Sequence, residues 1–313
     1  MLYRSKKFLE NKLIEIQLSL AMRHKEFNPE NAILIFSDPR GGSTWLAQLI
    51  QHIPNTAVVW EPLHLKEGSY FKHLNFGWRQ HIPKDANWSE ARQAFSELFQ
   101  GKHLNAYSTF LSAIKDYRNA DYLIFKFCRG NALLPWLVDQ FSFKYLPVYL
   151  IRHPFAVAAS QIKQGGWSSD YQGFKMPDVP FNEIYLEHKS FLSSLRTKEE
   201  SLVATWCISN MHALNNDNNN QEWICIYYEN LLLDPEKELK RIFQLWNMHI
   251  PEGILSAVRK PSKTTISDSN VKNLSSQLSS WQVFFDQDTI DKLQRILDYF
   301  EITHYSKETM PLL

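Results

Sequence analysis

The sequence predicts an α/β fold in which a five-stranded parallel sheet carries helices on both faces. Short, strongly apolar runs alternate along the chain with longer segments whose apolar residues recur at helical spacing. The first apolar run ends in a tight, glycine-containing turn that leads straight into a helix. We expect the strands at 33–36, 56–60, 122–127, 145–151 and 223–228.

Helical segments separate these strands. Proline or helix-capping residues mark several of their starts, as at Pro154 and at Asp234 with Pro235. The first helix has apolar residues at helical spacing among charges, and we interpret it as an amphipathic packing helix. Its apolar residues are Phe8, Leu9, Leu13, Ile16 and Leu20. The expected helices are 8–23, a helix from 45, 89–100, one from 132, 154–162, 202–214, 235–246 and 288–300.

Length and composition restrict the class of protein. The 313 residues suffice for one large domain, 1–313, and no internal repeat divides it. Lys plus Arg number 34 and Asp plus Glu 33, so no overall charge favours nucleic acid as a partner. No apolar run approaches the length of a membrane span, and the first residues do not resemble a secretion signal. Three scattered cysteines show no metal or disulfide spacing, so we expect a cytoplasmic enzyme without a metal.

The turn after the first strand has the composition of an anion-binding loop. It contains Gly41 and Gly42, which allow a close backbone approach, followed by Ser43 and Thr44 where a helix N-cap belongs. Free N–H groups and the positive end of the helix would then face a bound anion. The fold is therefore P-loop-like, but no Lys stands between Gly42 and Ser43, and the cation is Arg40 instead. A nucleotide kinase of the P-loop type lacks its main phosphate ligand here.

This loop resembles the 5′-phosphosulfate loop of sulfotransferases that use 3′-phosphoadenosine-5′-phosphosulfate (PAPS). Matching residues run from Pro39 and Arg40 through Gly42, Ser43 and Thr44 to Trp45, and the resemblance implies that Trp45 stacks on adenine. A second segment resembles the family's 3′-phosphate motif, with Arg152 and Ser160 as the two phosphate ligands. A third, from Tyr227 to Leu239, resembles the segment in which Tyr228 lines the adenine site.

The resemblance departs from the cytosolic branch of the family in two places. Cys128 stands where that branch has its catalytic His, although Lys126 matches and is expected to contact the sulfuryl group. The late phosphate clamp is also missing, and we expect the basic segment with Arg259 and Lys260 to replace it. The pattern is closer to the bacterial and carbohydrate-type branches. These often use a Glu after the second strand as base, and Glu61 has that placement.

The resemblance implies transfer of a sulfuryl group from PAPS to a hydroxyl, leaving 3′-phosphoadenosine-5′-phosphate (PAP). Glu61 would act as general base, and Arg40 and Lys126 would stabilise the leaving oxygen. The acceptor is a small molecule or a carbohydrate, bound by a helical insertion at 62–120, while 1–30 forms an N-terminal arm. An oligomer is not indicated. The alternatives are a P-loop nucleotide kinase and a non-catalytic nucleotide-binding module.

Overall fold

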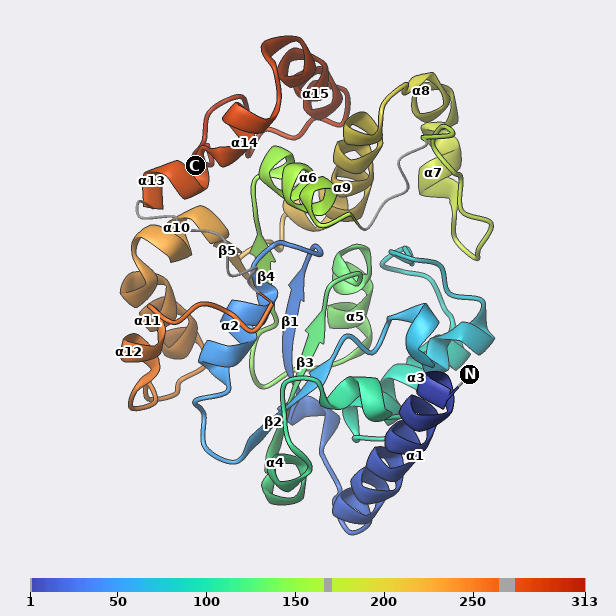
Figure 1. Ribbon diagram of the computed structural model, residues 1–313, viewed down its shortest axis with the longest axis vertical. Coiled ribbons are helices and arrows are strands. Elements are labelled where there is room, and N and C mark those ends of the chain that lie inside the picture. The colour runs from blue at the N-terminus through green and yellow to red at the C-terminus, as the bar shows by residue number, and fades with distance from the viewer. Residues whose placement is uncertain (1, 166–170, 265–273, 313) are drawn as a thin grey trace.

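The computed structural model describes residues 2–165, 171–264 and 274–312 (Figure 1). Its centre is a five-stranded sheet in the order β2-β3-β1-β4-β5, and all neighbouring strands are parallel. The α/β prediction is therefore confirmed. The strands are β1 Ile33–Ser37, β2 Thr56–Trp60, β3 Tyr122–Phe127, β4 Val148–Ile151 and β5 Ile224–Tyr227.

Alternate residues of each strand enter two separate cores, as the two-residue repeat of a strand requires. In β1, Ile33 and Ile35 pack toward α2, α10, α11 and α12, whereas Leu34 and Phe36 pack toward the larger core with α3, α5, α6 and α9. Figure 1 shows α2, α11 and α12 on one side of β1 and α3 and α5 on the other. These four apolar residues of β1 are all fully buried, which explains their unbroken apolar run.

The helices agree with most of the expected segments. The α-helices are α1 Leu2–Met22, α2 Ser43–Ile50, α3 Ser89–Phe99, α4 Ile114–Asn119, α5 Leu134–Gln140, α6 Pro154–Lys163, α7 Glu183–Glu187, α8 Lys189–Ser194, α9 Lys198–Leu214, α10 Tyr228–Leu233, α11 Pro235–Leu245, α12 Ile254–Ala257, α13 Leu274–Leu278, α14 Ser280–Phe284 and α15 Gln287–Tyr299. Five short 3₁₀ turns are η1 Pro29–Asn31, η2 Leu65–Glu67, η3 Tyr70–Leu74, η4 Ala106–Thr109 and η5 Asn131–Leu133.

Three expectations need correction. Strand β4 begins at Val148 rather than at residue 145, and β5 ends at Tyr227 because Tyr228 already begins α10. Helix α2 begins at Ser43, so its N-cap is Gly42 rather than a hydroxyl residue.

The apolar face expected to bury α1 is the exposed one. Its five residues are 56 to 66% exposed: Phe8, Leu9, Leu13, Ile16 and Leu20. The helix instead packs on α4 and η4, and its buried residues are Leu18 and Ala21. Two apolar stripes run along α1, and periodicity alone does not tell which one faces the protein.

Candidate active site

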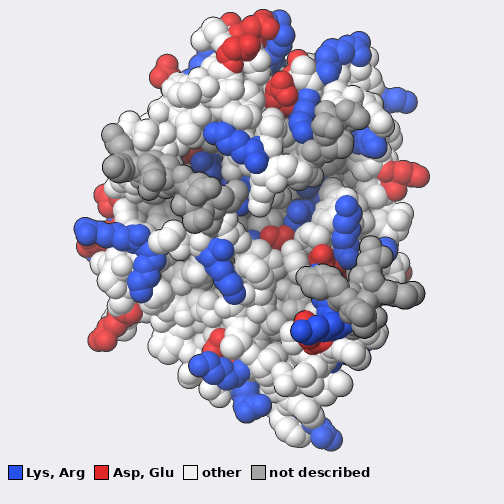
Figure 2. Space-filling model, viewed as in Figure 1, with Lys and Arg blue, Asp and Glu red and all other residues white. Residues whose placement is uncertain are grey.

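The parallel sheet brings the ends of all five strands, and the segments that follow them, to one edge. Arg40 follows β1, Glu61 follows β2, and Lys126 lies near the end of β3. Arg152 follows β4, and Tyr228 follows β5. Ligands of open α/β sheets bind at this edge. In Figure 2, Lys and Arg side chains line a central hollow of this face, and acidic atoms lie at its floor.

The loop between β1 and α2 (residues 38–42, the glycine loop) has an unusual backbone. Gly42 has φ 98°, and a Cβ added there would lie 2.5 Å from Cδ2 of Tyr228. Only glycine fits both the left-handed conformation and the close approach of the tyrosine ring. Arg40 also has a positive φ of 72°, which is costly for a residue with a side chain. Such strain in a loop before a helix start is typical of functional sites.

Arg40, Arg152 and Ser160 converge although 120 residues separate the first from the last. Nε of Arg40 donates to Oγ of Ser160 at 3.1 Å, and Nη1 of Arg152 donates to the backbone carbonyl of Arg40 at 2.9 Å. Burial lowers the pKa of Arg40, and the charge of Arg152 lowers it further. Neither guanidinium forms an ion pair with a carboxylate among the described residues. Two neighbouring cations that are not ion-paired with a carboxylate form a candidate anion site.

Two aromatic side chains adjoin this pair of cations. The Tyr228 ring lies under the guanidinium of Arg152, with 4.5 Å between its centroid and Cζ. Trp45 meets Tyr228 edge to face, with the ring centroids 6.2 Å apart. The structure therefore brings together the residues of all three sequence motifs. An adenine ring near Trp45 and Tyr228 stays a prediction.

Glu61 lies between two cations. Its carboxylate accepts from Nζ of Lys126 at 3.0 Å and from Nη1 of Arg129 at 2.5 Å. Burial raises the pKa of Glu61, but the charges of Lys126 and Arg129 outweigh it and lower the pKa to about 2. The carboxylate is thus ionised at neutral pH. Glu61 also has a positive φ of 37°, so the backbone turns sharply where β2 ends.

Lys126 is fully buried, so it is not a solvated strand-end lysine. Its Nζ lies 3.7 Å from the centroid of the Trp60 ring and 2.8 Å from Sγ of Cys128. That sulfur also lies 3.2 Å from Oγ of Ser43, at the start of α2. Burial raises the pKa of Cys128, so its thiol is protonated. Cys128 therefore links the charged pair at β2 and β3 to the glycine loop.

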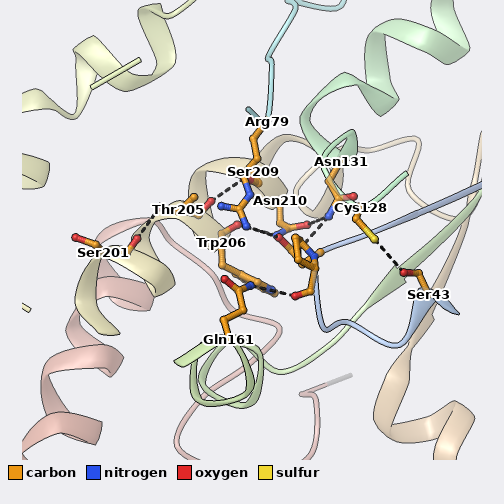
Figure 3. Close-up of polar contacts among 12 residues, drawn as sticks. Ser43, Arg79, Cys128, Asn131, Gln161, Ser201, Thr205, Trp206, Ser209 and Asn210 are labelled. Atoms are coloured by element: carbon orange, nitrogen blue, oxygen red, sulfur yellow. Dashed lines mark hydrogen bonds and ion pairs between the residues drawn. The ribbon is translucent and has the colours of Figure 1, made fainter. Parts of the chain in front are cut away.

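A buried polar network, which the sequence did not indicate, holds the side chain of Asp38 in the glycine loop. Asp38 accepts from Nδ2 of Asn131 at 3.1 Å and from Nδ2 of Asn210 at 2.8 Å. Nη2 of Arg79 lies 3.7 Å from the other carboxylate oxygen. Figure 3 shows Arg79, Asn131 and Asn210 pointing toward one another from three different segments. Burial raises the pKa of Asp38, while Arg79 and both amides lower it.

Sequence reasoning missed these residues for a physical reason. Asp38 has the composition of a turn, and Arg79 lies in an irregular segment with no periodicity. Their partners, Asn131 and Asn210, come from η5 and α9, so only the folded chain places them together. The position of Arg129 could have indicated a site residue, because it stands three residues after Lys126 and follows the end of a strand.

Arg259 and Lys260 take part in none of the contacts described above, although Lys260 lines a cavity together with Trp45. Both side chains are exposed, and Lys260 lines a surface cavity of about 510 Å³ with Gln48, His52 and Asp116 among others. The residue of this segment that reaches the loop is Thr264, whose carbonyl accepts from Nη1 of Arg40 at 3.4 Å. A phosphate contact of Arg259 and Lys260 stays a prediction. The remainder of that basic segment lies outside the described residues.

The described residues hold no group of three or more His, Cys, Asp or Glu side chains arranged to bind a metal ion. In the same part of the chain no helix is both long and apolar enough to cross a membrane.

The fold and the loop define a P-loop-like α/β protein with a candidate anion site at the carboxyl edge of its sheet. Residues 30–308 match the family model described as the sulfotransferase domain, and the chain therefore belongs to the sulfotransferase family. No curated protein matches the sequence significantly.

Three solved structures are similar in overall fold. The sulfotransferase domain of a Synechococcus olefin synthase is 20% identical, with a TM-score of 0.45 over 87% of this chain and 95% of that one. The sulfotransferase domain from the curacin biosynthetic pathway is 18% identical, with a TM-score of 0.46 over 86% and 96%. Mouse sulfotransferase SULT7A1, complexed with PAP, is 14% identical, with a TM-score of 0.45 over 93% and 90%.

Proposed function

We propose that this chain transfers a sulfuryl group from PAPS to a hydroxyl of a small-molecule or carbohydrate acceptor. The observation that carries the proposal is the convergence of Arg40, Arg152 and Ser160 beside the glycine loop. Together they offer donors for two separate anionic groups, as a nucleotide with both a 3′-phosphate and a 5′-phosphosulfate requires. Family membership supports the transferase activity, and the choice of donor and acceptor is our inference.

The residues fit this donor in their chemistry. Arg152 and Ser160 would hold the 3′-phosphate, and the loop amides with Ser43 and Thr44 would hold the 5′-phosphosulfate. Trp45 and Tyr228 offer aromatic faces for adenine. When bound, PAPS supplies an activated sulfuryl group.

The protein's own groups would then handle one proton and one developing charge. Glu61 accepts the proton of the acceptor hydroxyl as the oxygen attacks sulfur. Arg40, Lys126 and the loop amides stabilise the negative charge that grows on the leaving phosphate oxygen. Lys126 contacts Glu61 directly, so this mechanism would use one cation beside both groups whose charge changes.

The proposal separates cleanly from the kinase alternative. We expect PAP to bind the wild-type chain in a calorimetric titration, and ATP with Mg²⁺ to bind far more weakly, because no Lys follows the glycines. Incubation with radiolabelled PAPS and a panel of hydroxyl acceptors should yield sulfated product. Tight binding of ATP with phosphoryl transfer would instead establish the kinase, and PAP binding without transfer to any acceptor would favour a binding module.

A further inference from the structure

The order of the strands divides the site into two halves. The groups proposed for the donor follow β1, β4 and β5, whereas Glu61, Lys126 and Arg129 belong to β2, β3 and the segment after β3. An acceptor hydroxyl that approaches Glu61 therefore enters over the β2–β3 half. The residues that surround this half determine which acceptors fit.

Arg129 follows β3 and therefore lies in the β2–β3 half, the acceptor half. One of its terminal nitrogens contacts Glu61, and its Cζ lies 4.7 Å from the centroid of the Trp78 ring. The side chain remains 22% exposed, and Trp78 is 38% exposed, so both reach solvent. An arginine that stacks on an aromatic ring has a fixed plane and keeps in-plane donors for a further ligand.

Arg79 is the second arginine, and it follows Trp78 directly. Its guanidinium is largely buried, yet its contact with Asp38 is 3.7 Å long, beyond hydrogen-bond distance. Its Nε is buried and has no hydrogen-bond partner among the described residues. An unpaired buried donor is costly, and here it belongs to a charged group. Arg79 also has a positive φ of 62°, a strained conformation that aims this side chain inward.

The charges of this half do not balance. Glu61 already lies between Lys126 and Arg129, so one of these two cations has no counter-charge. Burial lowers the pKa of Arg79, Asp38 opposes this effect, and Arg129 adds to the lowering because its charge is close. Two neighbouring guanidiniums repel each other unless an anion lies between them.

We propose that Arg79 and Arg129 bind an anionic group of the acceptor, such as a carboxylate, beside the hydroxyl that receives the sulfuryl group. The inference rests on the proposed function and narrows its acceptor class to hydroxy acids and other anionic hydroxyl compounds. A carboxylate is planar and accepts two parallel hydrogen bonds, which matches the donor geometry of a guanidinium. The ring of Trp78 forms the apolar border of the same subsite.

Matched pairs of acids and methyl esters test this subsite. The probes are 3-hydroxybutyrate, 4-hydroxybenzoate and glucuronate, each compared with its own methyl ester. Sulfate transfer from radiolabelled PAPS is measured for each compound, and millimolar titrations of the PAP-bound protein measure binding without turnover. We expect at least one acid to bind and react roughly tenfold better than its ester, the loss typical of one charged hydrogen bond.

Variants tie the preference to the two arginines. Arg79→Gln and Arg129→Gln should each abolish the preference for the acid, and Arg129→Gln should leave PAP affinity within about twofold. Arg79→Lys keeps the charge but loses the planar donor pair, so it should keep part of the preference. Arg118→Gln, an exposed arginine of α4, is the matched control and should change nothing.

The outcomes distinguish this inference from the proposed function. Failure of PAP to bind the wild-type chain would contradict the proposed function itself. If PAP binds but esters equal acids, or no acid binds at millimolar concentration, only the subsite is wrong. If both glutamine variants slow acids and esters equally, the arginines act on the donor or on Glu61 and not on an anionic group of the acceptor, and the inference is again wrong.

Discussion

Nζ of Lys126 lies 3.0 Å from Oε1 of Glu61, across the adjoining ends of β3 and β2. Trp60 and Lys126 pair in the sheet register, and Glu61 directly follows Trp60. This ion pair therefore does not depend on a flexible loop. It places the candidate base and a candidate charge-stabilising group in one fixed unit.

Replacing Glu61 tests its role as base. Glu61→Gln keeps the size of the side chain but removes proton acceptance, so kcat should fall by roughly 10²- to 10⁴-fold. PAP affinity should remain nearly unchanged, because Glu61 lies in the acceptor half. Steady-state kinetics with PAPS and a working acceptor measure the effect. Glu67→Gln, at an exposed position nearby, is the control, and near wild-type turnover of Glu61→Gln would place the base elsewhere.

The pH dependence follows from the lowered pKa of Glu61. With a pKa of about 2, Glu61 stays ionised throughout the neutral and mildly acidic range, so no acidic limb of kcat/KM should arise from it above about pH 4. The folded-state pKa lies below the ordinary value, so the stability from these ion pairs is present above pH 4.5 and is lost as the pH falls toward 2.

Removing one of the two cations should move that limb. Burial raises the pKa of Glu61, and in Arg129→Gln, of the two charges, only that of Lys126 still opposes this effect. The pKa of Glu61 should therefore be higher in this variant than in the wild type. The acidic limb of kcat/KM should therefore move to higher pH in the variant. A pH–rate profile that is identical in both proteins would show that Glu61 does not control the rate.

Arg40 should act mainly on the chemical step. Its guanidinium adjoins the glycine loop and Ser160, where the leaving oxygen of the donor is expected. Arg40→Ala should lower kcat more than it raises KM for PAPS, since charge on that oxygen develops late. An effect confined to KM would make Arg40 a binding group only.

Replacing Gly42 tests the close contact between the glycine loop and Tyr228. Gly42→Ala places a Cβ against Tyr228 and forces a residue with a side chain to φ 98°, so PAP affinity should fall by more than tenfold, as roughly 1.4 kcal/mol or more of binding energy is lost. Gly173→Ala is the control, because Gly173 has φ 90° but no atom within 4 Å of an added Cβ. Calorimetry that shows equal PAP affinity in both variants would contradict the close approach of Tyr228.

The sequence predicted the sheet well because its strands are buried on both faces. Continuous apolar runs such as 33–36 have few alternatives at that length, and the polar residues directly after them fall at one edge. Arg40, Arg152 and Tyr228 could therefore be placed before the fold was seen, since each matches a motif at a strand end.

Other features depend on contacts that no local pattern records. The buried face of α1 is decided by η4 and α4, which begin only at Ala106 and Ile114, far along the chain from Met22, where α1 ends. Asp38 meets Asn210 across 172 positions, and Arg79 lies in an irregular segment. The pairing of Glu61 with Arg129, which lowers the pKa of the proposed base, likewise depends on the arrangement of β2 and β3.

The central claim is that Arg152 recognises the 3′-phosphate of the nucleotide. The most direct measurement is a calorimetric comparison of wild type and Arg152→Ala with two ligands, PAP and adenosine 5′-phosphosulfate, which lacks that phosphate. The exposed Lys240→Ala serves as control. We predict that Arg152→Ala weakens PAP roughly tenfold to a hundredfold, the loss of one charged hydrogen-bonded contact, and barely changes adenosine 5′-phosphosulfate. Equal losses for both ligands, or none for either, would contradict the account.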